Sequence, residues 1–177
     1  MTVSKVSVES IKELRNLSSA SIADCKTALH DTKGDVTKAF ELLRKRGLEK
    51  VAAKGDRVAK EGRVDAYVHL GNKIGVLVEI DCETDFVSKN ESFAQFSKDV
   101  AMQIAACSPT YITREEVPAE TIASLDDKEQ FFKTHCLFEQ PFIKDPGLTI
   151  KDYLGSLVAK FNEKIVLRRF ARYKIGA

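Results

Sequence analysis

Three carboxylates and one aromatic residue lie close together near the middle of the chain, where they could support chemistry. Asp81, Glu83 and Asp85 occupy alternate positions in a short stretch that ends at Phe86. Clustered carboxylates can hold a cation, but a calcium loop also needs Gly or Asn at set positions, and this stretch has neither. The spacing therefore predicts no metal site here.

A second pair that suggests chemistry is His135 beside Cys136. A thiol in contact with an imidazole can act as an activated nucleophile, but adjacent residues on a helix or strand point apart. The sequence also has no Gly-x-Ser-x-Gly turn to present a serine nucleophile. Because no set of catalytic residues is visible, the sequence predicts that the chain is not an enzyme.

Motifs that bind cofactors are also missing from the sequence. There is no Gly-x-x-x-x-Gly-Lys-Ser/Thr loop to hold phosphates, so we expect no direct nucleotide binding. The spacing of the cysteines and histidines fits no zinc site, so we expect no metal and no cofactor. We expect the thiols to be buried and reduced at Cys25, Cys82, Cys107 and Cys136. The alternative is a disulfide bridge between two copies of the chain through one exposed cysteine.

Phe86 has an unusual setting, because it lies in a short polar connection between two expected elements. Phenylalanine is normally buried. In one interpretation Phe86 folds back as a hydrophobic staple, although Val87 occupies the usual staple position before the expected helix cap at Ser88. In the other, Phe86 is an exposed aromatic wedge held between two rigid elements, with Asp85 beside it. The spacing alone leaves both interpretations open.

The composition places the chain among ordinary globular proteins. Its 177 residues are 44% hydrophobic and 31% charged, with a net charge of +2. No apolar run approaches the roughly 20 residues that span a bilayer. The first five residues contain no apolar core of a signal peptide. We therefore expect no membrane association and a cytoplasmic location.

Residues 1–47 predict a domain of three short helices. Ser7 can cap the first helix and Asp35 the third, and Gly47 can end the third. Helical spacing connects Val8, Ile11 and Leu14, then Ile22, Cys25, Ala28 and Leu29, then Val36, Ala39, Phe40 and Leu43. Residues 48–62 are rich in Ala, Lys and Arg and predict a basic linker.

Residues 63–177 predict an α+β core domain. Residues 63–70 and 74–82 alternate apolar and polar side chains, which is typical of two antiparallel strands with one apolar face each. A third strand is expected at 165–175. Capping boxes at 88–91 and 149–152 predict helices that follow them. The sequence thus indicates a three-stranded antiparallel sheet with helices packed on one face.

Several blocks of sequence resemble the elongation factor Ts family. The signature is Thr84-Asp85-Phe86-Val87, followed by Ser88-Lys89. The blocks occur in the family's order and cover nearly the whole chain, with Ile11 to Arg15, Ala23 to Leu29, Gly34 to Ala39, Ile74 to Ile80, Gln140 to Asp145 and Ile165 to Phe170 also matching. The resemblance implies a ubiquitin-associated type of N-terminal domain and a short member with a single core subdomain.

The same resemblance implies a function. Members of the family exchange GDP on elongation factor Tu, whose GTPase domain they bind during translation elongation. The signature phenylalanine inserts between helices of that domain, disturbs the magnesium site and loosens the phosphate-binding loop. Carried over, Phe86 would be the wedge, Asp85 its polar neighbour, and Thr84 and Val87 the rest of the signature. Lys26 would help the N-terminal domain to grip the same partner.

The chain departs from the family pattern in three places. Residues 18–21 replace the glycines that many members have before the Asp-Cys-Lys block, and the stretch between Ile122 and Phe131 is shorter than in most relatives. The chain also lacks room for the second core subdomain of long members. Short members can use two copies to reach the same partner, so the resemblance allows a homodimer.

The main alternative is an RNA-binding module of the translation apparatus. Residues 168–174 interleave basic and aromatic side chains, as RNA-binding surfaces do. A net charge of +2 is small for that role. The competing interpretation of this stretch is a strand whose arginines face solvent while Phe170 or Tyr173 packs.

Overall fold

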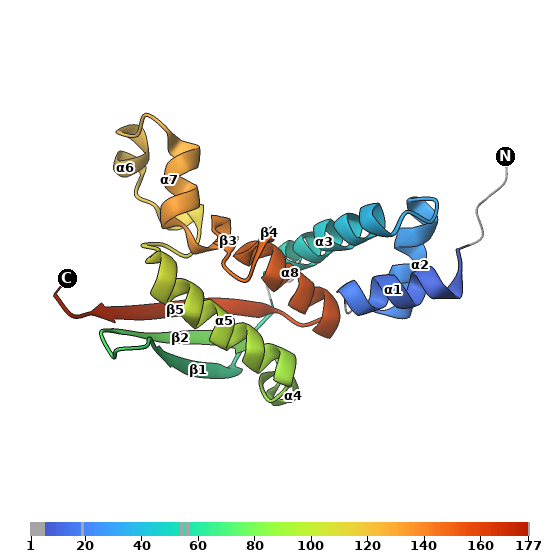
Figure 1. Cartoon of the computed structure of the whole chain (residues 1–177), viewed down its shortest axis with the longest axis horizontal. Helices are drawn as coiled ribbons and strands as arrows, with labels where there is room; N and C mark the ends of the chain where they lie inside the picture. Colours follow the sequence, from blue (N-terminus) through green and yellow to red (C-terminus); the bar gives the residue numbers. More distant parts are fainter. Residues whose placement is uncertain (1–5, 19, 54, 56, 177) are drawn as a thin grey trace. The chain divides into compact units, whose positions relative to one another are not determined.

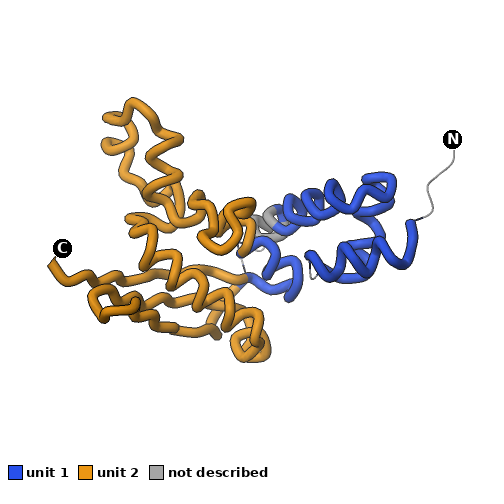
Figure 2. Tube along the Cα trace, viewed as in Figure 1, with its two compact units in different colours: residues 1–57, 154–164 blue, residues 58–153, 165–177 orange. Residues whose placement is uncertain are grey.

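The structure is a computed structural model that describes all residues except 1–5, 19, 54, 56 and 177. It contains two compact units, one of residues 1–57 with 154–164 and the other of residues 58–153 with 165–177 (Figure 2). The domain limits 1–47, 48–62 and 63–177 inferred from the sequence stay a prediction.

The first unit begins with the three predicted helices, α1 (Val8–Ser18), α2 (Ile22–Asp31) and α3 (Val36–Ala53) (Figure 1). The Ser7 side chain accepts the backbone N–H of Ser10, and Asp35 accepts that of Lys38, as expected for helix caps. Their shared core consists of Leu14, Ala20, Cys25, Ala28, Leu29, Ala39 and Leu43. Ile22 was expected on the apolar face of the second helix but is exposed.

The predicted end of the third helix at Gly47 is wrong, because α3 continues through this residue to Ala53. Gly47 is buried against Gly155 of α8 (Ile150–Phe161), within the same compact unit. Glycine suits a close approach of two helix backbones because it has no Cβ. The same residue type therefore marks a helix crossing here and not a helix end.

We expect Gly47→Ala to destabilise the protein by about 1–3 kcal/mol, because the added Cβ overpacks the crossing. That Cβ would lie 2.6 Å from the carbonyl oxygen of Gly155. At an uncrowded helix position the same change would stabilise by up to about 1 kcal/mol, so the sign of the effect is informative. Urea denaturation measures it, with Gly75→Ala as the control, since a Cβ at Gly75 would meet nothing within 4 Å. A more stable Gly47→Ala protein would contradict the close crossing.

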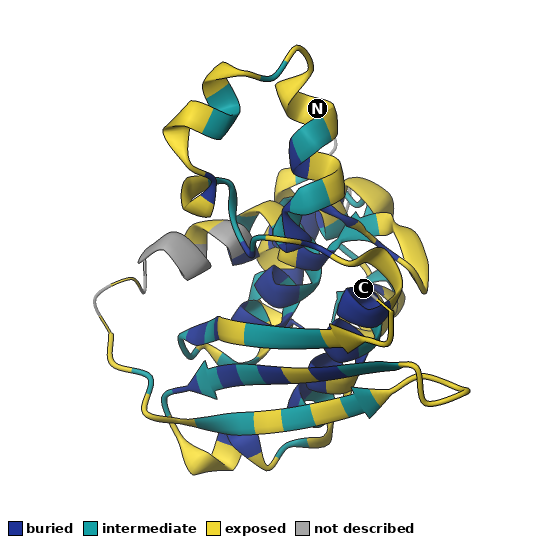
Figure 3. Cartoon of the chain, turned by 90° about the vertical axis from the view of Figure 1, so that its left-hand side faces the viewer, coloured by how far each residue is buried: buried dark blue, intermediate teal, exposed yellow. Residues whose placement is uncertain are grey.

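The second unit is built on the predicted three-stranded antiparallel sheet. Its strands are β1 (Glu61–Val68), β2 (Ile74–Cys82) and β5 (Ile165–Lys174), in the order β1-β2-β5. Gly71 and Asn72, both with positive φ, form the turn between β1 and β2. The helix α5 (Glu91–Cys107) packs on β1 and β2, which confirms the α+β class. Buried residues alternate with more exposed ones along most of β2 (Figure 3).

The apolar side chains of β1 lie on the opposite side of the sheet from the buried side chains of β2. Val64 is 67% exposed, and Ala66 and Val68 are exposed as well. The register explains this difference, because Asp65 is the partner of the buried Val78 and Ala66 is the partner of Leu77. The open face of the sheet is therefore apolar on β1, while the covered face of β1 carries polar residues.

The rest of the second unit contains short elements between α5 and α8. They are the 3-10 helices η1 (Arg114–Glu116) and η2 (Leu137–Glu139), the helices α6 (Ala119–Ala123) and α7 (Lys128–His135), and the strands β3 (Pro141–Phe142) and β4 (Asp145–Thr149). The pairing of β3 with β4 was not predicted from the sequence. A small core around Val117, Phe132 and Cys136 holds these helices together. Thr149 and Asp152 form the predicted capping box at the start of α8.

Candidate partner-binding site

The signature residues form a one-turn helix, α4 (Asp85–Ser88), directly between β2 and α5. Thr84 occupies its N-cap position and Lys89 its C-cap position. The predicted capping box at 88–91 is wrong, because Ser88 ends α4 and Asn90 caps α5 by accepting the backbone N–H of Ser92 at 2.9 Å. The chain thus makes a full helical turn where the sequence suggested only a connection.

Phe86 and Val87 point in different directions from this turn. The side chain of Phe86 is 77% exposed, whereas that of Val87 is only 2% exposed. Consecutive residues of a helix face about 100° apart, so a single turn can bury one and expose the other. Of the two interpretations that the sequence left open, the exposed aromatic residue is the one observed, and Val87 supplies the anchor beneath it.

Side chains from the turn and its neighbours hold α4 in place. The Cys82 thiol donates to the carbonyl of Thr84 at 3.1 Å, and the Ser88 hydroxyl donates to the carbonyl of Asp85 at 2.9 Å. Arg63 of β1 donates to the carbonyl of Ser88 at 3.5 Å. The turn that carries Phe86 is therefore fixed at both of its ends.

The carboxylate of Asp85 is held by an ion pair within the same turn. Lys89 Nζ lies 2.6 Å from Asp85 Oδ2. The hydrogen bond and the charge of Lys89 lower the pKa of Asp85, and Asp85 in turn raises the pKa of Lys89. Asp81 pairs instead with Arg168, and no group of three potential metal ligands gathers among the described residues. Two of the three clustered carboxylates, Asp81 and Asp85, thus have separate partners.

We expect Lys89→Met to raise the pKa of Asp85 toward the ordinary value of about 3.9. The ion pair favours the charged carboxylate, so it is intact at neutral pH and is lost as the pH falls through the lowered pKa of Asp85. A carbon-13 NMR titration of the Asp85 carboxyl group measures the shift. Lys38→Met is the matched control, because Lys38 pairs with Asp35 on a different helix. An unchanged Asp85 midpoint in Lys89→Met would show that the pair does not form.

Lys26 lies in the first compact unit, on α2. Its side chain is exposed, while the neighbouring Cys25 is buried in the helical core. The N-cap of this helix is Ser21, which accepts the backbone N–H of Asp24 at 3.1 Å. Lys26 is thus accessible to solvent or to a partner on a well-capped helix, and its helix belongs to a different unit from Phe86.

Comparison with known proteins decides the family. A family model described as "Elongation factor TS" matches residues 2–129. The elongation factor Ts of Carboxydothermus hydrogenoformans is 46% identical over 194 residues, covering 97% of this chain and 89% of that protein. That of Caldanaerobacter subterraneus subsp. tengcongensis is 44% identical, covering 97% of each protein. The chain belongs to the elongation factor Ts family.

Membership makes the chain a translation elongation factor, as the resemblance of its signature block implied. The aligned span of 194 residues is longer than the 177 residues of the chain, so these elongation factor Ts proteins carry residues that it lacks. In the described part of the chain, no helix has both the length and the apolar character needed to cross a membrane.

The basic stretch that suggested RNA binding lies on β5, and its arginines are engaged in contacts within the protein. Arg168 pairs with Asp81, and Arg169 pairs with Glu79. Arg172 donates to the carbonyl of Ala105 near the end of α5, at 3.1 Å. Arg168 and Arg169 are nevertheless exposed and Phe170 is partly buried, as the strand interpretation expected, whereas Tyr173 is exposed.

The contacts that support the candidate site were not predicted from the sequence. Lys89 could have been found, because it lies four residues after Asp85, the spacing of an ion pair on a helix. Arg63 and Asp65 could have been paired, because residues two apart on a strand share a face. The contact between Arg63 and Ser88 joins residues that are 25 positions apart in the chain. A contact over this separation leaves no local pattern in the sequence, so it could not have been predicted.

Proposed function

We propose that the chain is a guanine-nucleotide exchange factor that promotes GDP release from elongation factor Tu. The observation that carries this proposal is the 77% exposure of Phe86 on a turn that Val87 anchors from below. A large aromatic side chain that is exposed on a fixed turn is the kind of anchor that dominates the binding energy of protein–protein contacts. Phe86 is the wedge that enters the GTPase domain and disturbs its magnesium and phosphate-binding site.

The physical basis of the exchange is linkage between two binding events. Bound magnesium supplies much of the positive charge that holds nucleotide phosphates. A factor that binds best to the nucleotide-free partner weakens nucleotide binding by the same coupling free energy with which the nucleotide weakens binding of the factor. No covalent bond is made or broken, so the proposed activity needs no catalytic residue.

The other signature residues have supporting roles in this proposal. Asp85 lies beside the wedge with an exposed carboxylate that can engage the partner, and Thr84 begins the turn. Val87 holds the turn to the core. Lys26 provides a second, separate contact from the N-terminal unit to the same GTPase domain. The proposal places the protein in the cytoplasm, where translation elongation takes place.

Release of a fluorescent GDP analogue from elongation factor Tu tests the proposal directly. The fluorescence decay is followed after adding excess unlabelled GDP, with and without the chain. We expect the observed release rate to rise with the concentration of the chain and to reach a plateau. A release rate that stays at the spontaneous value over the whole concentration range would refute the proposed function.

We also propose that a second copy of the chain covers the open face of the sheet. This face carries exposed apolar side chains on all three strands, with Val64 and Val68 on β1, Leu77 on β2 and Tyr173 on β5. A hollow of about 280 Å³ on this face is lined by Val64, Leu77 and Ala171, among others. The charged residues at its border are already paired with each other, as in Glu79 with Arg169, so the face is suited to an apolar, self-complementary contact.

Sedimentation equilibrium of the chain and of Leu77→Lys tests this second partner. Leu77 is 48% exposed, so the substitution should leave the fold intact while placing a charge in the middle of the face. We expect a dimer for the native chain and a monomer for the variant. A native monomer at concentrations of about 100 μM, above the dissociation constants of stable dimers, would contradict the proposal.

A further inference from the structure

The helix that carries Phe86 is too short to be stable by itself. It has four residues, Asp85–Ser88, and isolated helices in water need about 12–15 residues to form even in favourable sequences. The last carbonyl groups of any helix also lack partners within the helix. The orientation of Phe86 therefore depends on contacts that come from outside the turn.

One of these contacts comes from β1. Arg63 Nη1 donates to the carbonyl of Ser88, the last residue of α4, at 3.5 Å. A positive charge at the C-terminal end of a helix is favourable because the free carbonyl groups there are partly negative. Ser88 itself is buried, so its carbonyl has limited access to water. Arg63 thus makes a long hydrogen bond to the end of the turn opposite to the end that Cys82 holds.

Arg63 is itself fixed in position by Asp65. The guanidinium donates through Nε to Oδ2 at 3.1 Å and through Nη2 to Oδ1 at 3.2 Å. This two-pronged geometry locks the plane of the guanidinium and leaves Nη1 for Ser88. The side chain of Asp65 is only 14% exposed. Its hydrogen bond with Arg63 lowers the pKa of Asp65 against the effect of burial, so the carboxylate stays charged at neutral pH.

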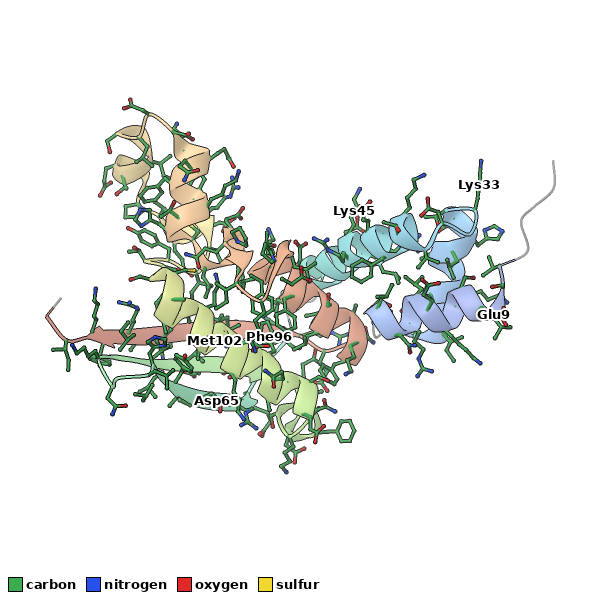
Figure 4. All side chains as sticks on the ribbon, in the orientation of Figure 1. Glu9, Lys33, Lys45, Asp65, Phe96 and Met102 are labelled. Atoms are coloured by element: carbon green, nitrogen blue, oxygen red, sulfur yellow. The ribbon has the colours of Figure 1, made fainter. Side chains whose placement is uncertain are left out.

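The position of this pair in the sheet is unusual. Asp65 pairs in register with Val78, and Arg63 with Ile80, and both of those β2 residues are buried. The pair therefore lies on the covered side of β1, which is one of the two edge strands of the sheet; Figure 4 labels Asp65. The side chains of Arg63 and Asp65 are 33% and 14% exposed, and ion pairs that keep access to water contribute little to stability. Stability alone thus gives no reason for charges here, whereas positioning of α4 does.

We infer that Arg63, oriented by Asp65, is a positioning residue that holds α4 in the geometry that presents Phe86. The consequence for nucleotide exchange rests on the proposed function, but the effect on the turn does not. Without the contact the turn samples other arrangements, and only a fraction of the molecules presents Phe86 correctly. The apparent affinity for the partner falls by that fraction, while the bound complex still reaches the same state.

A tryptophan at position 86 reports on the turn in the free protein. The chain contains no tryptophan, so Phe86→Trp introduces a single fluorophore. Time-resolved anisotropy of Trp fluorescence is compared for Phe86→Trp alone and combined with Arg63→Leu. We expect a larger amplitude of nanosecond depolarisation in the combined variant. Phe86→Trp with Arg114→Leu is the matched control, because Arg114 also pairs with two carboxylates but lies on η1.

Two outcomes of the anisotropy experiment are decisive. A depolarisation that is equal in the Arg63 and Arg114 combinations would overturn the inference. Since Arg63→Leu leaves Asp65 without its partner and can perturb the sheet, Arg63→Lys is measured as well. The lysine side chain keeps the charge but cannot form both contacts at once, so we expect an intermediate amplitude with a native far-ultraviolet spectrum. A fully rigid turn in Arg63→Lys would show that charge alone, and not the two-pronged contact, is what matters.

The exchange assay separates positioning from direct participation. For Arg63→Leu with the native Phe86, we expect the concentration of the chain that gives half of the maximal GDP release rate to rise by about threefold to tenfold. The maximal rate should not change, because only the fraction of molecules that present Phe86 correctly is lower. A lower maximal rate with an unchanged half-saturating concentration would contradict a positioning role. If the native chain itself fails to accelerate GDP release, the proposed function fails, and the anisotropy result still decides whether Arg63 orders the turn.

Discussion

Phe86→Ala is expected to remove most of the exchange activity on elongation factor Tu while leaving the fold intact. Truncating a central aromatic contact typically costs about 2 kcal/mol or more, which corresponds to a loss of about 30-fold or more. Phe86 is 77% exposed, so the free protein loses little burial when the ring is removed. The expected result is a large drop in the rate of GDP release without a comparable drop in thermal stability.

Leu70→Ala provides the matched control for this experiment. Leu70 is 91% exposed on the turn between β1 and β2, away from α4 in the sequence and in the sheet. It tests whether loss of any exposed apolar side chain weakens exchange. We expect native exchange from Leu70→Ala and the same melting temperature for both variants. Native exchange from Phe86→Ala would reject the wedge mechanism, although the chain could still act as an exchange factor by other contacts.

A size series at position 86 tests the wedge more finely. Phe86→Leu keeps an apolar side chain but shortens its reach, so we expect exchange between that of the native chain and that of Phe86→Ala. Val87→Ala acts differently, because Val87 is buried and its truncation should lower the stability of the fold, which Phe86→Leu should not. The contrast between these neighbouring residues follows from the phase of one helical turn.

The helices and strands could be predicted from the sequence wherever a long periodic pattern and a cap agreed. The caps at Ser7 and Asp35 and the alternation in β2 are such cases. The face of β1 that turns to the helices could not be predicted, because an alternating strand has two faces and only the register with β2 assigns them. The predicted helix end at Gly47 was wrong for a related reason. A glycine at a helix end and a glycine at a helix crossing cannot be distinguished from the sequence alone.

The candidate site was visible in the sequence only in part. Phe86 was identified by its setting, but Phe86 and Val87 are adjacent apolar residues, and either could have been the buried one. The phase of α4 decides this, and it depends on tertiary contacts such as that of Arg63 with Ser88. Local sequence therefore located the turn, while its geometry is a property of the folded sheet and helix.

The largest stability effect is expected from Gln103→Leu, in a polar contact that the sequence did not reveal. Gln103 is fully buried on α5. Its amide donates to Gln140 Oε1 at 3.2 Å and to the carbonyl of Pro141 at 3.1 Å. Its oxygen accepts the backbone N–H of Ile143 at 2.9 Å. One side chain thus joins α5 to the hairpin of β3 and β4.

Leucine has nearly the size of glutamine, so Gln103→Leu removes hydrogen bonds without opening a large cavity. It leaves the N–H of Ile143 and the amide oxygen of Gln140 without these partners inside the protein. We expect the free energy of unfolding to fall by about 2–4 kcal/mol, the combined cost of unsatisfied buried polar groups. Urea denaturation gives this value, and hydrogen exchange at the Ile143 amide should show the earliest loss of protection.

Gln95→Leu is the matched control on the same helix. Gln95 is exposed and donates to Asp99, which keeps its contacts with Lys144 and Tyr153. A surface substitution of this kind should change stability by less than about 0.5 kcal/mol. If Gln103→Leu were equally mild, the hairpin would not depend on this glutamine, and its attachment to α5 would have to come from other contacts, such as the ion pair of Lys144 with Asp99, whose atoms lie 2.7 Å apart. A large difference between the two variants would show instead that a single buried amide fixes the hairpin.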